Sequence, residues 1–257
     1  MIRPTFPQLT FIALSNCHAN TQATLEDALP NLIHLLGDLH QPLHLADHLQ
    51  GGNEAPAFFT PFNRISPVST TLHLIYDFWI PNQLIQSYRG VTNFVQHMAQ
   101  LLRGKYGEFG EEVRRSWVKC VFAEQETSTV RAFMPLGITT SPLRMARRCV
   151  GEWAVESMDM SCKYQLWKGW ADHQDLSKGA YNERAKQVVY MLIAKTAWRI
   201  AVVLEILFKT CPIGMVNGVL YANPGDYPPP PPTSHAESVL SAAQVFSTSP
   251  QKQVVVF

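Results

Sequence analysis

A histidine-rich segment near the start of the chain has residue types that bind metal ions. Residues 31 to 53, NLIHLLGDLHQPLHLADHLQGGN, contain four of the nine histidines in the 257-residue chain. His34 is followed four positions later by Asp38, and His73 is followed four positions later by Asp77. Because residues four apart on a helix lie on one face, each pair predicts two side chains that point in the same direction.

These two pairs predict a metal site that supports hydrolysis. Zinc accepts imidazole nitrogen and carboxylate oxygen, and a set of His and Asp ligands without cysteine suits a site that keeps one position open for water. His44 follows Pro42, which interrupts a helix, so the ring of His44 can approach from a different direction. A single His/Asp pair is more often a surface hydrogen bond than a pair of ligands. Two pairs, His44 and the Gly-Gly-Asn sequence that ends at Asn53 together favour a metal site.

The elements that must position these residues are helices. Leucine and isoleucine recur at helical spacing over residues 22 to 41, until Pro42. A second helix is predicted to begin at Thr70 or Thr71 and to end before Pro81. Further helices are predicted over residues 82 to 104, 108 to 124, 142 to 170 and 181 to 209, and a loop over residues 45 to 70. The expected fold class is therefore mainly α, with packed helices and long functional loops.

Composition and hydropathy exclude some classes of protein. Lysine and arginine number 21 against 20 aspartates and glutamates, and this balance argues against nucleic-acid binding through a broad basic surface. No uncharged run reaches about eighteen residues, so we expect no membrane insertion. Residues 1 to 211 predict one helical domain. The five prolines from Pro228 to Pro232 cannot continue a helical core, so we expect residues 212 to 257 to form a Pro-rich, largely unstructured tail.

Three motifs in the first third of the chain resemble those of a known family. HLLGDLHQPLH begins at His34, GGN ends at Asn53 and TLHLIYD ends at Asp77. Together they resemble the signature of the zinc-dependent single-strand-specific nucleases and 3′-nucleotidases, which are relatives of bacterial zinc phospholipase C. EWAVESMDMSC, residues 152 to 162, is similar to a further segment of that family. The resemblance implies a mainly α, multi-helix domain of the phospholipase C and single-strand nuclease type.

The resemblance assigns the histidines and aspartates to different zinc ions. The family uses three zinc ions. His44, His73 and Asp77 match the three protein ligands of one zinc, so this site is expected to be complete. His34 and Asp38 match two of the four ligands of a second zinc, so this site is expected to be partial.

Other residues also receive roles from the resemblance. Asp38 matches a carboxylate that bridges two zinc ions and is therefore the expected catalytic residue, and Asn53 matches a residue beside the scissile phosphate. His40 lies within the motif but does not match a ligand, and we expect it to hydrogen-bond the loop after the helix. Cys17 and Cys162 match family positions that pair as a disulfide.

The resemblance also implies an activity and a setting. The expected reaction is hydrolysis of phosphoester bonds in single-stranded DNA or RNA and in 3′-nucleotides by a zinc-bound hydroxide. No protein partner is implied. The family resemblance favours secretion or a vesicular lumen, although the N-terminal segment, with Pro4 and Pro7, makes a poor signal peptide.

The chain departs from the family pattern before His34. Four ligand positions of the family have no match there, and we expect the N-terminal portion of the family domain to be absent. The chain should then hold zinc at His44, His73 and Asp77 but not the full cluster. An alternative interpretation is a degenerate zinc-binding relative, or a fragment, without catalytic turnover. A lipid-cleaving phospholipase C is a more distant alternative, because GGN and the EWAVES segment match the nuclease branch.

Overall fold

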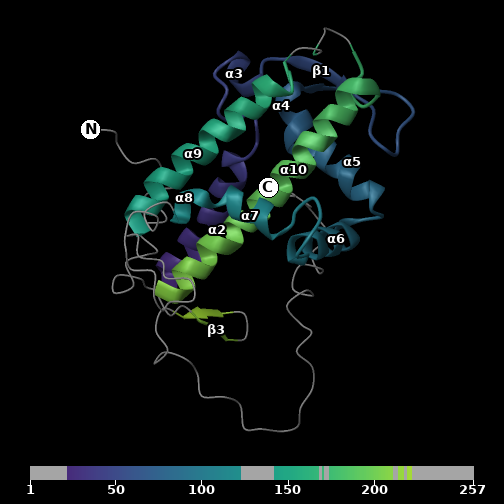
Figure 1. Ribbon diagram of the computed structural model, residues 1–257. Helices are drawn as coiled ribbons and strands as arrows, with labels where there is room; N and C mark the ends of the chain where they lie inside the picture. Colours follow the sequence, from purple (N-terminus) through teal and green to yellow (C-terminus); the bar gives the residue numbers. More distant parts are fainter. Residues whose placement is uncertain are drawn as a thin grey trace.

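The structure is a computed structural model that describes residues 22–122, 142–167, 170, 174–210, 214–216 and 219–221. It is mainly helical, as predicted (Figure 1). The helices are α2 (Gln22–Leu39), α3 (Leu49–Gly52), α4 (Leu72–Leu74), the π-helix η1 (Ile75–Trp79), α5 (Ile80–Ser87), α6 (Val91–Arg103), α7 (Glu111–Trp117), α8 (Lys119–Phe122), α9 (Pro142–Lys163) and α10 (Gly179–Thr210). The strands are β1 (Pro56–Phe59), β2 (Val68–Thr71), β3 (Gly214–Val216) and β4 (Val219–Tyr221).

The long helix α10 joins two hydrophobic clusters. The first half of α10 packs with the β1–β2 hairpin, η1, α5 and α6. The second half packs with α2, α8 and α9. Helices α9 and α10 run in opposite directions (Figure 1). Ion pairs between Glu156 on α9 and both Lys195 and Arg199 on α10 connect them. These charged residues of α10 lie between its two apolar segments.

Several predicted helix boundaries are confirmed and others are wrong. Helices α2 and α10 begin and end close to the predicted positions, whereas α9 begins at the predicted residue but ends at Lys163 rather than at residue 170. Thr71 caps α4 by accepting a hydrogen bond from the backbone N–H of Leu74. The helical segment that starts at α4 continues past Pro81, because Pro81 lies in the first turn of α5, where a proline is tolerated. The predicted helix over residues 82 to 104 is broken at Arg89 and Gly90, whose φ angles are +63° and +117°.

The predicted loop over residues 45 to 70 contains a β-hairpin. Strands β1 and β2 pair antiparallel, with Pro56 opposite Thr71 and Phe59 opposite Val68. The side chain of Phe59 is buried, so the hairpin is anchored in the first cluster. The hairpin leads directly into α4, and it therefore determines where His73 begins its helical turn.

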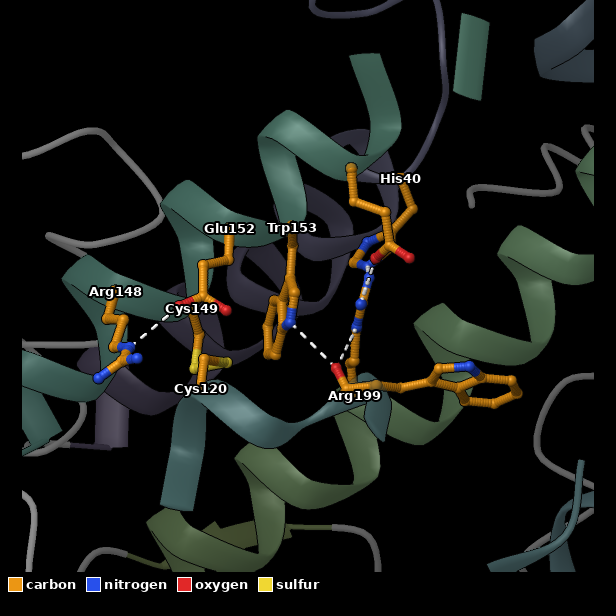
Figure 2. Close-up of a disulfide and its surroundings, with 9 residues drawn as sticks. His40, Cys120, Arg148, Cys149, Glu152, Trp153 and Arg199 are labelled. Atoms are coloured by element: carbon orange, nitrogen blue, oxygen red, sulfur yellow. Dashed lines mark hydrogen bonds and ion pairs between the residues drawn. A yellow bond between two sulfur atoms is a disulfide. The ribbon is translucent and has the colours of Figure 1, made fainter. Parts of the chain in front are cut away.

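A disulfide bond lies in the second cluster. Cys120 of α8 pairs with Cys149 of α9 (Figure 2). Cys162, which was predicted to pair with Cys17, is a free thiol exposed near the end of α9, and Cys17 lies outside the described residues. The second cluster buries Cys120 and Cys149 on packed helices, which brings them together despite a sequence separation of 29.

Part of the segment that was predicted to be unstructured forms strands. Strands β3 and β4 pair antiparallel, and β4 lies against α2. The prediction is therefore wrong for these two strands, and the other residues from 212 to 257 lie outside the described residues. Among the described residues, no helix is long and apolar enough to cross a membrane.

Candidate metal centre

Two histidines and an aspartate from separate segments meet in one place. The Nε2 atoms of His44 and His73 each lie 3.1 Å from a carboxylate oxygen of Asp77. The two imidazole rings stack with their centroids 4.9 Å apart. One ligand atom from each side chain lies within 4.8 Å of the other two, and no other group of three His, Cys, Asp or Glu side chains in the described ranges does so. This donor set matches what a zinc ion accepts from proteins.

Short helical segments aim these three side chains. His44 lies in a chain of turns after α2, in which the Gln41 N–H donates to the Asp38 carbonyl and the His44 N–H donates to the Gln41 carbonyl. His73 lies in α4 and Asp77 in the π-helix η1. Single-turn π-helices within α-helical segments are frequent at functional sites. Here η1 carries the carboxylate that both histidines contact.

The Gly-Gly-Asn sequence fixes the orientation of His73. The Nδ1 atom of His73 donates a hydrogen bond to the Gly51 carbonyl over 2.8 Å, so in the neutral ring Nε2 carries the lone pair that can bind a metal ion. Gly51 has a φ of +63°, and a Cβ there would lie 2.6 Å from the Leu43 carbonyl oxygen. Glycine is therefore required at this position for both conformational and steric reasons.

Electrostatic interactions keep the Asp77 carboxyl ionised, which favours the binding of a cation. Burial would raise the pKa of the Asp77 carboxyl, but hydrogen bonds with His44, His73 and Gln41 outweigh burial and hold this pKa well below its usual range. The hydrogen bond with Asp77 raises the pKa of His73, although burial opposes this shift. The site therefore carries a carboxylate at neutral pH, with two imidazoles beside it.

Asp38 lies between two histidines. One carboxylate oxygen is 3.3 Å from Nε2 of His34, and the other is 3.7 Å from Nδ1 of His44. Both predicted pairs four residues apart, His34 with Asp38 and His73 with Asp77, thus form contacts. His34 is half exposed, and no third donor from the described residues joins His34 and Asp38 in a ligand group.

An open cavity of about 430 Å³ lies beside the three donors. Its lining includes Asp38, His44, His73 and Asn53. Asn53 is exposed, and its side-chain amide donates to the Gln50 carbonyl over 3.0 Å. Three of the five predicted ligands, Asp38, His44 and His73, therefore share with the predicted substrate contact one hollow that is accessible to solvent.

Comparison with known proteins identifies the family of the chain. Residues 11–209 match the model of the S1/P1 nuclease family. The chain belongs to the S1/P1 nuclease family. It is also 26% identical to nuclease S1 of Aspergillus oryzae over 185 residues, which cover 70% of this chain and 54% of that relative. The chain thus spans about half the length of the curated relative that it matches.

In this member of the S1/P1 nuclease family, a glutamine that the sequence analysis missed also contacts the site. Nε2 of Gln41 donates to Asp77 over 2.7 Å, and its Oε1 accepts a hydrogen bond from the Leu43 N–H. The position of Gln41 inside HQPLH, between two predicted ligands, was the available signal.

His40 is structural, as predicted, but its partners differ from the expected ones. Its Nδ1 donates to the Leu36 carbonyl within α2 over 2.6 Å, and its Nε2 accepts from Arg199 of α10 over 2.9 Å. Burial and the charge of Arg199 lower the pKa of His40 to about 3, so the ring is neutral at physiological pH. Because both ring nitrogens are engaged, His40 does not act as a metal ligand.

Proposed function

We propose that this chain is a zinc-dependent hydrolase that cleaves phosphoester bonds in single-stranded DNA or RNA and in 3′-nucleotides. The observation that carries the proposal is the convergence of His44, His73 and Asp77 beside an open cavity. Membership of the S1/P1 nuclease family supports the same reaction class.

The three donors fit a zinc ion. His44 and His73 would each present Nε2, and Asp77 would present a carboxylate oxygen, at the point where these atoms already approach one another. A bound zinc would supply Lewis-acid polarisation of a phosphoryl oxygen and would lower the pKa of water. The Gly51 carbonyl and the Gln41 amide, which bond His73 and Asp77, would hold both ligands in their binding orientation.

The remaining site residues would form a second metal position and contact the substrate. Asp38 and His34 would form a partial second metal position, and Asp38, which also lines the cavity, is the proposed catalytic carboxylate. The exposed amide of Asn53 can donate to a phosphate oxygen in the same cavity. Because the chain is nearly neutral, phosphate recognition would be local to this site.

The proposal includes an oxidising compartment. The disulfide between Cys120 and Cys149 supports a secreted or lumenal location, because disulfides persist in oxidising environments.

Zinc binding and turnover can be measured together. Metal-free protein should bind one zinc ion tightly in calorimetry, and it should release products from single-stranded DNA or 3′-AMP in a reaction that a chelator stops. His73→Ala should lose tight zinc binding and product release. His48→Ala is the matched control, because His48 is exposed, packs against Trp167 and lies outside the donor group. Equal zinc binding by both variants would contradict the site.

One observation favours a second candidate function, a zinc-binding protein without turnover. Within the described ranges, His34 and Asp38 lack a third donor that would complete a second metal position. In that case the same experiment would give one bound zinc that depends on His73, with no chelator-sensitive release of nucleotide or phosphate.

A further inference from the structure

The motif that carries the metal donors also contains a buried anchor. His40 follows Asp38 by two residues and precedes His44 by four, yet its side chain is only 2% exposed. The ring lies among α2, α9 and α10, where it packs near Trp153 and meets Arg199 (Figure 2). The segment from Asp38 to His44 therefore presents Asp38 and His44 to the cavity and buries His40 in the core.

Every nitrogen of the Arg199 guanidinium donates a hydrogen bond. NH1 donates to Nε2 of His40 over 2.9 Å, Nε donates to the Trp117 carbonyl over 3.0 Å, and NH2 pairs with Glu156. The guanidinium also lies over the Trp153 ring, 4.9 Å from its centroid. A planar fork with three fixed partners has one orientation, and lysine cannot reproduce it.

The network around Arg199 is itself rigidly supported. The Trp117 carbonyl also accepts a hydrogen bond from Trp153 over 3.2 Å, and Lys195 forms a second ion pair with Glu156. Trp117 and Trp153 lie three and four residues from the two cysteines of the disulfide. Arg199 is thus a fixed point in the core rather than an adaptable surface charge.

Hydrogen bonds connect this fixed point to the metal donors. Because Nε2 of His40 accepts from Arg199, its Nδ1 carries the proton and donates to the Leu36 carbonyl at the end of α2. The next residue, Gln41, donates to Asp77, and its carbonyl accepts from the His44 N–H. Rotation or displacement of His40 would therefore move His44, which is a metal donor, and Gln41, which bonds the donor Asp77.

We propose that Arg199 is a positioning residue for the metal site: by bonding His40, it fixes the turn that carries Gln41 and His44. The inference rests on the proposed zinc site. A buried ion network of this kind could instead serve only to stabilise the fold. The two roles make different predictions for metal binding.

Cobalt(II) in place of zinc gives a direct measure of ligand geometry. Arg199→Lys should weaken zinc binding to metal-free protein by about tenfold, the lower end of the loss seen when the direct partner of a ligand is replaced, because Arg199 acts on the donors through His40 and Gln41. It should also change the visible absorption spectrum of the cobalt-loaded protein. His40→Phe, which keeps an aromatic ring but removes both hydrogen bonds, should have the same two effects.

Arg114→Lys is the matched control. Arg114 is also a buried arginine that lies over a tryptophan ring, with its guanidinium 4.7 Å from the centroid of Trp198, and it donates to the carbonyls of Gly104 and Phe109. These hydrogen bonds do not lead to the turn that carries Gln41 and His44. This variant should lower the melting temperature but leave zinc affinity and the cobalt spectrum unchanged.

The outcomes separate the inference from the proposed function. Failure of the unaltered protein to bind zinc would overturn the site and the inference with it. If the unaltered protein binds zinc, unchanged affinity and cobalt spectra in Arg199→Lys and His40→Phe would overturn the inference alone. Equal changes in Arg114→Lys would also overturn it, because general loosening of the core would then explain the result. If Arg199→Lys does not fold, His40→Phe decides between these outcomes.

Discussion

At the scale of single residues, the site depends on the groups that bond its ligands as much as on the ligands themselves. The Gly51 carbonyl orients His73, and Gln41 bonds Asp77. Neither residue is a metal donor of the predicted kind, yet each restricts a donor to one orientation. Zinc affinity should therefore respond to substitutions that leave all three donors in place.

Gly51→Ala tests this dependence. The new Cβ would meet the Leu43 carbonyl at 2.6 Å in a left-handed backbone, so the Gly51 carbonyl must move away from His73. We expect a loss of about 1 to 3 kcal/mol in the free energy of unfolding, together with at least a tenfold loss of zinc affinity, measured by calorimetry.

Gly179→Ala provides the control for backbone strain. Gly179 has a similar φ of +71°, but an added Cβ has no atom within 4 Å. This variant should lose stability by a comparable amount and keep its zinc affinity. If both variants bind zinc as the unaltered protein does, the Gly51 carbonyl has no role in orienting His73.

At the scale of elements, periodicity predicted the long helices but not the short elements around the site. Helices α2, α9 and α10 carry regular apolar spacing, and they form at the expected places. The β1–β2 hairpin was missed because Pro56, Pro61 and Pro67 read as loop signals. The break between α5 and α6 depends on left-handed backbone at Arg89 and Gly90, which hydrophobic spacing does not report.

The sequence patterns also did not predict contacts between distant elements. Spacing indicated a metal site among the two His/Asp pairs and His44, and the resemblance to the nuclease family grouped His44 with His73 and Asp77, which do lie together. His40 and Arg199 are 159 residues apart, and no local pattern links them. The pairing of Cys120 with Cys149 likewise follows from the packing of α8 on α9.

The disulfide between α8 and α9 should contribute measurably to stability. It closes a loop with a sequence separation of 29, and the chain-entropy relation gives about 3 to 4 kcal/mol for such a loop. The double variant Cys120→Ala/Cys149→Ala should therefore unfold at a lower denaturant concentration, as should the reduced protein. Cys162→Ala removes the exposed free thiol and should leave the midpoint unchanged. Equal midpoints for the oxidised and reduced protein would exclude this contribution.

At the scale of the whole molecule, a charged network lies at the junction of the two hydrophobic clusters. Helix α10 contributes Ala194 to the first cluster and Val203 to the second, and Lys195 and Arg199 lie between them. Glu156 of α9 pairs with both cations. The charge on Glu156 therefore affects how the two halves of the molecule are held together.

The stability of the whole fold should depend on the protonation of Glu156. Burial raises the pKa of this carboxyl, but the charges and hydrogen bonds of Arg199 and Lys195 outweigh burial and hold the pKa below its usual range. A carboxyl whose pKa is lower in the folded state stabilises the protein above its unfolded pKa. That contribution is lost as the pH falls through the folded pKa. The unaltered protein should thus lose stability below about pH 4.5.

Glu156→Gln separates this effect from general acid unfolding. The variant lacks the charge at every pH, so at pH 7 it should be less stable by about 2 kcal/mol, the scale of a hydrogen bond to a charged group. Its free energy of unfolding should fall less steeply below pH 4.5, and the two proteins should converge in acid, as urea titrations at each pH would measure. Glu152→Gln, one turn away on α9, breaks the exposed pair with Arg148, and it should change stability by less than about 1 kcal/mol. Parallel pH profiles for Glu156→Gln and the unaltered protein would mean that the junction does not depend on this charge.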